Sequence, residues 1–156
     1  MTIRPPRHDD VDALIAMCTR MHEESAYSFL PFDSPKVARL ILAYVEHPET
    51  YGGFVAEAAG GLAGMIGGYV TDYFFCDEKI ASDMVLFVEK KFRSTRMAFG
   101  LIRAFEQWAS ERGARELCMG VSTEVSTEGT GRLYEHMGMR CVGGLYKKTL
   151  DVKEPS

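Results

Sequence analysis

Residues Asp83 to Trp108 read DMVLFVEKKFRSTRMAFGLIRAFEQW, and a charged turn joins an apolar run, Met84 to Val88, to an amphipathic segment. The apolar side chains of that segment recur at spacings of four, four and three, at Met97, Leu101, Phe105 and Trp108. The pattern predicts a strand, a short basic loop and a helix. The N-terminus of such a helix directs backbone N–H groups and the positive end of its dipole to one place, which suits a phosphate.

The basic loop carries Arg93 and Arg96, whose charges match phosphate oxygens, although a solvated basic turn would have the same sequence. Residues 88–98 resemble the acyl-CoA pyrophosphate loop of the GNAT superfamily of N-acyltransferases. That loop has a Gln or Arg, two residues, a Gly, one residue, and then Gly or Ala. Arg93 and Ala98 match its two ends, Arg96 replaces the middle Gly, and Ser94 stands where another Gly is frequent. Arg96 either narrows the approach of a phosphate to the backbone or supplies its own guanidinium, and the sequence leaves both open.

A second motif lies downstream, where Leu133-Tyr134 is followed by Gly138-Met139. It resembles the closing signature of the same family, a Leu-Tyr pair before a helix end and a Gly with an apolar residue. Thr127 stands where the family often has an Asn, seven residues before the Tyr. The two motifs occur in the family's order, and the resemblance covers nearly the whole chain.

The resemblance implies an α+β fold in α/β/α layers. Its sheet is mixed but mainly antiparallel, with six to seven strands, about four helices and a splay between the fourth and fifth strands. Turn signals and apolar runs predict strands at 2–4, 51–57, 62–75, 79–88 and 116–121, and a closing hairpin of 139–142 and 145–150 around Gly143-Gly144. Helices are predicted to start near Asp9-Asp10, at Ser34 as N-cap, at Met97 and at Ser126.

The glycines of the third strand, Gly64, Gly67 and Gly68, predict a bulge or close packing. Residues 1–152 are expected to form a single domain, with 153–156 as a tail.

The composition is that of a soluble globular protein, with 46% apolar and 26% charged residues among 156. The net charge of −4 argues against a nucleic-acid binder, and no apolar run is long enough for a membrane span or a signal peptide. The four cysteines are scattered without metal-ligand spacing and each lies in an apolar stretch, so we expect buried free thiols and no metal. These features predict a cytoplasmic protein whose basic loop binds a small anion.

The resemblance implies acetyl-CoA as cosubstrate, with its pantetheine arm in the gap between the splayed strands. The expected contacts are Leu86, Phe87, Val88, Arg93, Ser94, Thr95, Arg96, Met97 and Ala98. Backbone N–H groups at a bulged strand end near Phe87 and Val88 are expected to stabilise negative charge on the thioester oxygen.

By the same resemblance, Tyr134 is the general acid beside the sulfur; the alternative is a core tyrosine on an amphipathic helix. Asp83 is the candidate base, because some relatives carry a carboxylate near this place on the strand. A one-residue offset of the strand would turn Asp83 away and leave Ser82 on the catalytic face. The other candidate bases are Glu23, Glu124 and Glu128, or a chain of waters.

The segment EESAYSFLPF, residues 23–32, is irregular and aromatic. In the resembled family this segment often lies beside the acceptor, so Glu23, Tyr27 and Phe29 are candidate substrate contacts. Packing of the aromatic rings over the core is the other interpretation.

The expected activity is transfer of an acetyl group from acetyl-CoA to an amine of a small molecule or protein by direct attack. The alternative is a non-catalytic protein of the same fold that binds CoA or a protein partner without turnover. No nucleic acid or membrane partner is expected. Relatives are often dimers, so a homodimer is left open.

Overall fold

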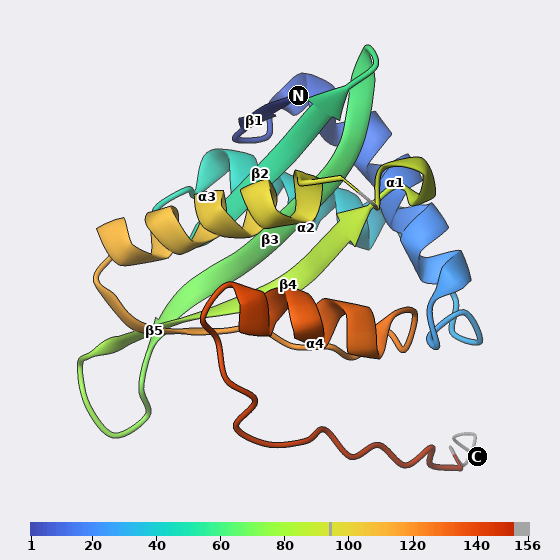
Figure 1. Cartoon of the computed structure of the whole chain (residues 1–156). Helices are drawn as coiled ribbons and strands as arrows, with labels where there is room; N and C mark the ends of the chain where they lie inside the picture. Colours follow the sequence, from blue (N-terminus) through green and yellow to red (C-terminus); the bar gives the residue numbers. More distant parts are fainter. Residues whose placement is uncertain (94, 152–156) are drawn as a thin grey trace, which may run out of the picture.

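The structure, a computed structural model, describes residues 1–93 and 95–151. Within these residues one sheet contains five strands in the order β1-β2-β3-β4-β5 (Figure 1). The strands are β1 (Thr2–Arg4), β2 (Tyr51–Ala58), β3 (Gly61–Asp72), β4 (Lys79–Val88) and β5 (Ala114–Cys118). The first four strands pair antiparallel in sequence, and β5 pairs parallel to β4. This is the mixed, mainly antiparallel sheet that the sequence predicted.

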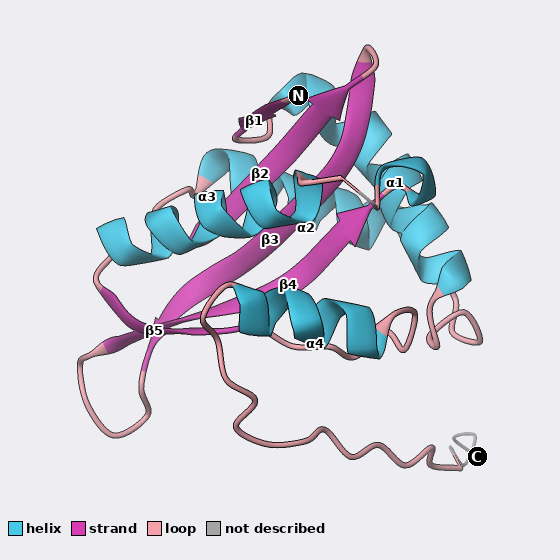
Figure 2. Ribbon diagram, in the orientation of Figure 1, coloured by secondary structure: helices cyan, strands magenta, loops and turns pink. Residues whose placement is uncertain are grey.

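In the described part of the chain, four α-helices cover both faces of the sheet (Figure 2). They are α1 (Val11–Glu24), α2 (Ser34–Glu46), α3 (Met97–Glu111) and α4 (Thr127–His136). Apolar residues of α1 and α2 pack on one face with Val55, Met65 and Phe87. Residues of α3 and α4 pack on the other face, around the fully buried Phe105. The predicted three-layer arrangement is therefore confirmed.

Local signals in the sequence predicted most of the helix and strand ends to within a few residues. The predicted bounds of β4 are those observed, and α3 begins at Met97 as expected. The prediction of Ser34 as N-cap was wrong. Asp33 is the N-cap of α2, and its Oδ1 accepts the Lys36 N–H at 2.9 Å. An Asp side chain at this position satisfies a helix donor that would otherwise be unpaired.

The predicted total of six to seven strands was wrong, since residues 139–151 form no strand. The expected hairpin runs as an extended segment below α4, with Val142, Leu145, Tyr146 and Leu150 all at least 67% exposed (Figure 1). A hairpin gains stability only by burying one face against another element. The neighbouring edge strand β5 has five residues and presents Arg115 and Glu116, both exposed. Such a short, charged edge discourages pairing.

The sheet opens between β4 and β5, because the two strands pair only from Lys79↔Ala114 to Ser82↔Cys118. Beyond Ser82, β4 continues to Val88 without β5 beside it. This confirms the predicted splay between the fourth and fifth strands.

A bulge interrupts β4 at the opening. Gly67 of β3 pairs with Val85 and Gly68 pairs with Asp83, which leaves Met84 as the extra residue. The backbones approach closely here: a Cβ on Gly68 would lie 2.2 Å from the Ser82 carbonyl oxygen. The glycines of β3 thus mark a bulge in the neighbouring strand, as predicted. The bulge lies at Met84, however, and not near Phe87 and Val88 as expected.

Candidate active site

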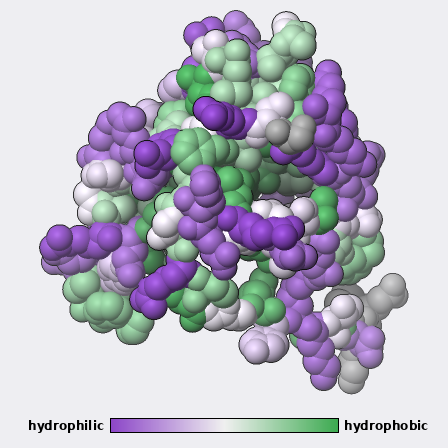
Figure 3. Space-filling model, viewed as in Figure 1, coloured by the Kyte–Doolittle hydropathy of each residue, from purple (hydrophilic) through white to green (hydrophobic). Residues whose placement is uncertain are grey.

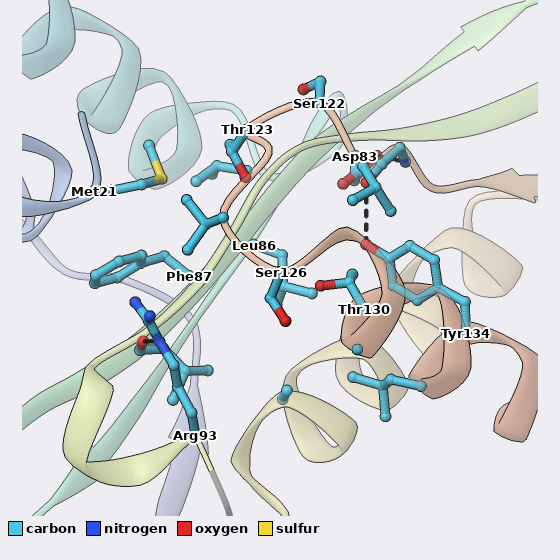
Figure 4. A pocket seen from close by; sticks show the side chains of 18 of the residues that line it. Met21, Asp83, Leu86, Phe87, Arg93, Ser122, Thr123, Ser126, Thr130 and Tyr134 are labelled. Carbon is cyan, nitrogen blue, oxygen red and sulfur yellow. Dashed lines mark hydrogen bonds between the residues drawn. The ribbon is translucent and has the colours of Figure 1, made fainter. Parts of the chain in front are cut away.

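A cleft of about 330 Å³ lies where the sheet opens (Figure 4). Its walls come from β4, from the loop between β5 and α4, from α4 and from the end of α1. In Figure 3 apolar side chains show in the recess between the more polar surfaces of α3 and α4. The cleft is long rather than round, with Arg93 at one end and the pair Asp83 and Tyr134 at the other (Figure 4).

The bulge at Met84 determines which way Asp83 points. Val85 and Phe87 pack on the side of α1 and α2, whereas Leu86 and Val88 pack on the side of α3 and α4. Regular alternation would place Asp83 with Val85 and Phe87. The extra residue reverses the alternation, so Asp83 faces α4. The predicted alternative, with Ser82 on the catalytic face, is not what the structure has.

Asp83 and Tyr134 both bind the main chain of Gly120, just beyond the end of β5. The Gly120 N–H donates to Asp83 Oδ1 at 2.8 Å, and the Tyr134 hydroxyl donates to the Gly120 carbonyl oxygen at 3.2 Å. Figure 4 shows the two side chains converging on this point. A carboxylate and a phenol are thereby held on the two sides of one residue at the open edge of the sheet.

Burial sets the protonation of both groups. It raises the pKa of Asp83 above the ordinary value of about 3.8, although the Gly120 N–H opposes the shift. Burial, followed by the negative charge of Asp83, raises the pKa of Tyr134. The phenol therefore stays protonated as a donor, while the carboxylate has an increased proton affinity. This combination suits one proton acceptor and one proton donor.

At the other end of the cleft, Arg93 is held by three neighbours. Its Nε donates to the Val88 carbonyl oxygen at 2.8 Å, and its guanidinium lies 5.4 Å from the centre of the Phe87 ring. Its Nη2 forms an ion pair with Glu24, whose side chain is only 15% exposed. Lys90 Nζ lies 3.4 Å from the same carboxylate. Two cations thus share one anion at the place where a phosphate was predicted.

The end of α1 fixes the basic loop. One helical turn before Glu24, Arg20 binds Glu89 through Nε at 2.9 Å and Nη2 at 2.6 Å. Residues four apart lie on one face of a helix, so both ion pairs form along one side of α1.

The predicted cofactor residues fall into two groups. Leu86, Phe87, Val88, Arg93 and Ala98 line the cleft. The others are arranged differently: Met97 is 1% exposed in the core, the Thr95 hydroxyl donates to the Phe92 carbonyl oxygen, and Arg96 is exposed before α3. Ser94 lies outside the described residues.

The predicted acceptor residues do not line the cleft itself. Glu23 is exposed, Phe29 is 68% exposed, and Tyr27 is partly buried. A hydrogen bond of 3.0 Å from the Ala26 N–H to the Thr123 carbonyl oxygen nevertheless brings this segment against the cleft wall. Of the candidate bases, Asp83 is the one that lines the cleft; Glu23, Glu124 and Glu128 are exposed and lie outside its lining.

Sequence reasoning missed Gly120 and the residues Ser122, Thr123, Ser126 and Thr130, which form the wall opposite β4. The available signal was a Gly within the predicted strand 116–121, where a Gly often marks a close approach of the backbone. The contact between Glu24 and Arg93 was not predicted either.

The family model described as "Acetyltransferase (GNAT) family" matches residues 15–139. The chain belongs to this family. GNAT acetyltransferases carry out acyl transfer and use acetyl-CoA as cosubstrate. The match covers both predicted motifs and every residue that lines the cleft. No curated protein matches the chain in sequence.

Solved structures share the GNAT fold of this chain at low sequence identity. A ribosomal-protein-alanine N-acetyltransferase from Brucella melitensis biovar Abortus 2308 is 16% identical, with a TM-score of 0.73, over 96% of this chain and 100% of its own. An aminoglycoside acetyltransferase from an uncultured soil metagenomic sample, in complex with sisomicin, is 18% identical, with a TM-score of 0.72, over 97% and 96%. A transcriptional regulator from Bacillus halodurans C-125 is 17% identical, with a TM-score of 0.74, over 96% and 99%.

The expected burial of the free cysteines was wrong for three of the four: Cys76, Cys118 and Cys141 are exposed, whereas Cys18 is partly buried. Among residues 1–93 and 95–151, no three His, Cys, Asp or Glu side chains gather as a metal site would require. None of the described helices has the length and apolar character needed to cross a membrane.

Proposed function

We propose that this protein is an N-acetyltransferase that moves the acetyl group of acetyl-CoA to an amine. The observation that carries the proposal is the attachment of Asp83 and Tyr134 to opposite sides of Gly120, where β4 and β5 part. Membership in the GNAT family supports acyl transfer. Among the structural neighbours are acetyltransferases named for an alanine of a ribosomal protein and for aminoglycosides, which favours an amine as acceptor.

The cleft has the features that acetyl-CoA requires. On the side of β4 that faces β5, no strand of the described residues lies beside β4 beyond Ser82. The backbone groups on that side are therefore available to an extended, amide-bearing chain. Arg93 lies at the far end of the cleft and carries the charge that a pyrophosphate needs. We infer that Leu86, Phe87 and Val88 would line the pantetheine arm and that Arg93 would bind the pyrophosphate. When bound, acetyl-CoA supplies an acetyl group activated as a thioester.

The residues of the chain then have distinct tasks. Asp83 accepts a proton from the incoming ammonium, directly or through a water, because only a neutral amine has a free lone pair for attack. Its raised pKa makes it a better proton acceptor than an exposed carboxylate. Tyr134, kept protonated by burial, donates its proton to the leaving sulfur. When acetyl-CoA is bound, a backbone N–H of β4 at the Met84 bulge would stabilise negative charge on the thioester oxygen.

Arg93 and Glu24 give a test of the cofactor end of the cleft. Replacing Arg93 with Ala removes one charge-assisted contact, so binding of CoA should weaken by about 1.5–3 kcal/mol, roughly tenfold to hundredfold.

Replacing Glu24 with Gln should have the opposite effect, because the carboxylate competes with phosphate for Arg93 and Lys90. We expect the E24Q protein to bind CoA about threefold to tenfold more tightly. Titration calorimetry of each variant with CoA measures both changes.

The matched control for Glu24 is Glu106→Gln, which removes the same charge from the exposed side of α3. An unchanged dissociation constant for Arg93→Ala would remove Arg93 from the phosphate site. Weaker binding by the E24Q protein would mean that Glu24 positions Arg93 for the phosphate and does not compete with it.

The second candidate function is a non-catalytic CoA-binding protein. The observation that favours it is the ion pair between Arg93 and Glu24, because a carboxylate already neutralises the Arg at the predicted phosphate site. The two candidates differ at the other end of the cleft. A protein that only binds CoA has no use for Asp83 and Tyr134, whereas a transferase loses turnover when either is changed.

A further inference from the structure

A second polar cluster lies at the rim of the cleft, apart from Asp83 and Tyr134. The ammonium of Lys147, in the extended C-terminal segment, donates to the Ser122 carbonyl oxygen at 3.1 Å and forms an ion pair with Glu124. It also lies over the face of the Tyr27 ring, 5.0 Å from the ring centre. A carbonyl oxygen, a carboxylate and an aromatic face are three groups that stabilise an ammonium ion. Together they form an ammonium subsite, defined here as Tyr27, Ser122 and Glu124.

The backbone holds this ammonium subsite close to the reacting end of the cleft. The bond from Ala26 to Thr123 ties the segment of Tyr27 to the loop that follows β5. Ser122 lines the cleft and comes two residues after Gly120, which binds both Asp83 and Tyr134. Two residues of extended chain span about 7 Å. The ammonium subsite therefore lies within the length of a small molecule from Asp83.

The charge in this subsite keeps a bound amine protonated. The neighbouring Glu124 carboxylate raises the pKa of Lys147 above its ordinary value. A protonated amine has no lone pair and cannot attack a thioester. The amino group held here is therefore not the one that reacts; the reacting amine needs the proton acceptor at Asp83.

We propose that Tyr27, Ser122 and Glu124 bind a second, charged amino group of the acceptor, and that Lys147 occupies this subsite when no acceptor is bound. The acceptor class is then a diamine or longer polyamine: one amino group is held as ammonium at the rim while another reaches Asp83 in neutral form. The choice of acceptor rests on the proposed function. The binding of an ammonium ion rests on the contacts of Lys147 alone.

The test is titration of the full chain with 1,5-diaminopentane, without acetyl-CoA. In the wild type Lys147 competes as a tethered ligand, so replacing it with Gln should tighten binding of the diamine by about fivefold or more. Adding Glu124→Gln to the K147Q protein should reverse the gain. The matched control is Lys148→Gln, which removes the same charge from the neighbouring exposed residue and should leave the dissociation constant unchanged.

Equal binding by wild type and K147Q protein, or no binding by K147Q protein at millimolar diamine, would overturn the ammonium subsite. Binding of the uncharged analogue 1,5-pentanediol as tightly as the diamine would do the same. Acetyl-CoA titration is separate and keeps the two proposals distinguishable. Binding of the diamine without binding of acetyl-CoA would contradict the proposed function and support the ammonium subsite. Binding of acetyl-CoA without binding of the diamine would contradict only the ammonium subsite.

Discussion

Replacing Asp83 with Asn should lower the rate of acetyl transfer by about 100-fold or more, because the reaction loses its positioned proton acceptor. Asn keeps the shape of the side chain and can still accept the Gly120 N–H, so the cleft should keep its structure. The rate is measured as release of CoA from acetyl-CoA, with the best acceptor from a panel of amines that includes diamines. In the wild type the rate should also fall as the pH drops through the raised pKa of Asp83.

The same substitution should raise stability at neutral pH. The pKa of Asp83 is higher in the folded protein than the ordinary 3.8, so the folded state binds this proton more tightly than the unfolded chain. The free energy of unfolding of the wild type therefore decreases as the pH rises from the unfolded to the folded pKa, and the loss is complete above the folded value. Asn carries no charge at any pH. The free energy of unfolding of the D83N protein should therefore rise relative to that of the wild type across that window, and the difference should persist at higher pH.

Thermal unfolding at several pH values measures this difference. Asp72→Asn, at the exposed end of β3, removes the same charge outside the cleft and is the control for both readouts. If the D83N protein were less stable at neutral pH and fully active, Asp83 would be a structural residue that only caps the Gly120 N–H.

Replacing Tyr134 with Phe should lower turnover by about 100-fold while the affinity for acetyl-CoA changes by less than about twofold. The ring stays in place among its buried neighbours, and only the hydroxyl that donates to Gly120 is lost. Stability should fall by about 1 kcal/mol for this one hydrogen bond. Single-turnover measurements, in which chemistry limits the rate, separate the effect on the reaction from effects on product release.

Tyr73→Phe is the matched control, since it removes a hydroxyl that binds Glu116 in the middle of β5, outside the cleft. Unchanged single-turnover rates for the Tyr134→Phe protein would make Tyr134 a core residue. Absence of acetyl transfer by the wild type with every amine tested would instead favour the non-catalytic alternative.

Much of the fold follows from local sequence patterns. The apolar run of β4 and the helical spacing from Met97 to Trp108 predicted these elements, because the core packs against both faces of β4 and against one face of α3. The closing hairpin was wrong for a reason that local patterns do not contain. Gly143-Gly144 permits a turn, but pairing depends on the edge that β5 offers, and that edge is short and charged.

The candidate site was predictable where it lies on one element and less so where distant elements meet. The motifs located Arg93 and Tyr134, and the glycines of β3 indicated a bulge. The direction of Asp83 depends on the exact residue that bulges, Met84, which the strand pattern does not specify. The contact between Arg93 and Glu24 joins residues 69 positions apart. Only the packing of α1 against the basic loop reveals that an internal carboxylate occupies the predicted phosphate site.

Titration calorimetry of the purified protein with acetyl-CoA, and with CoA in parallel, tests the central claim most directly. We predict binding with a dissociation constant of about micromolar order, equivalent to roughly 8 kcal/mol. Such binding would support the cleft between β4 and β5 as an acetyl-CoA site despite Arg96 in the loop and Glu24 on Arg93. No heat of binding at millimolar acetyl-CoA would contradict the proposed transferase.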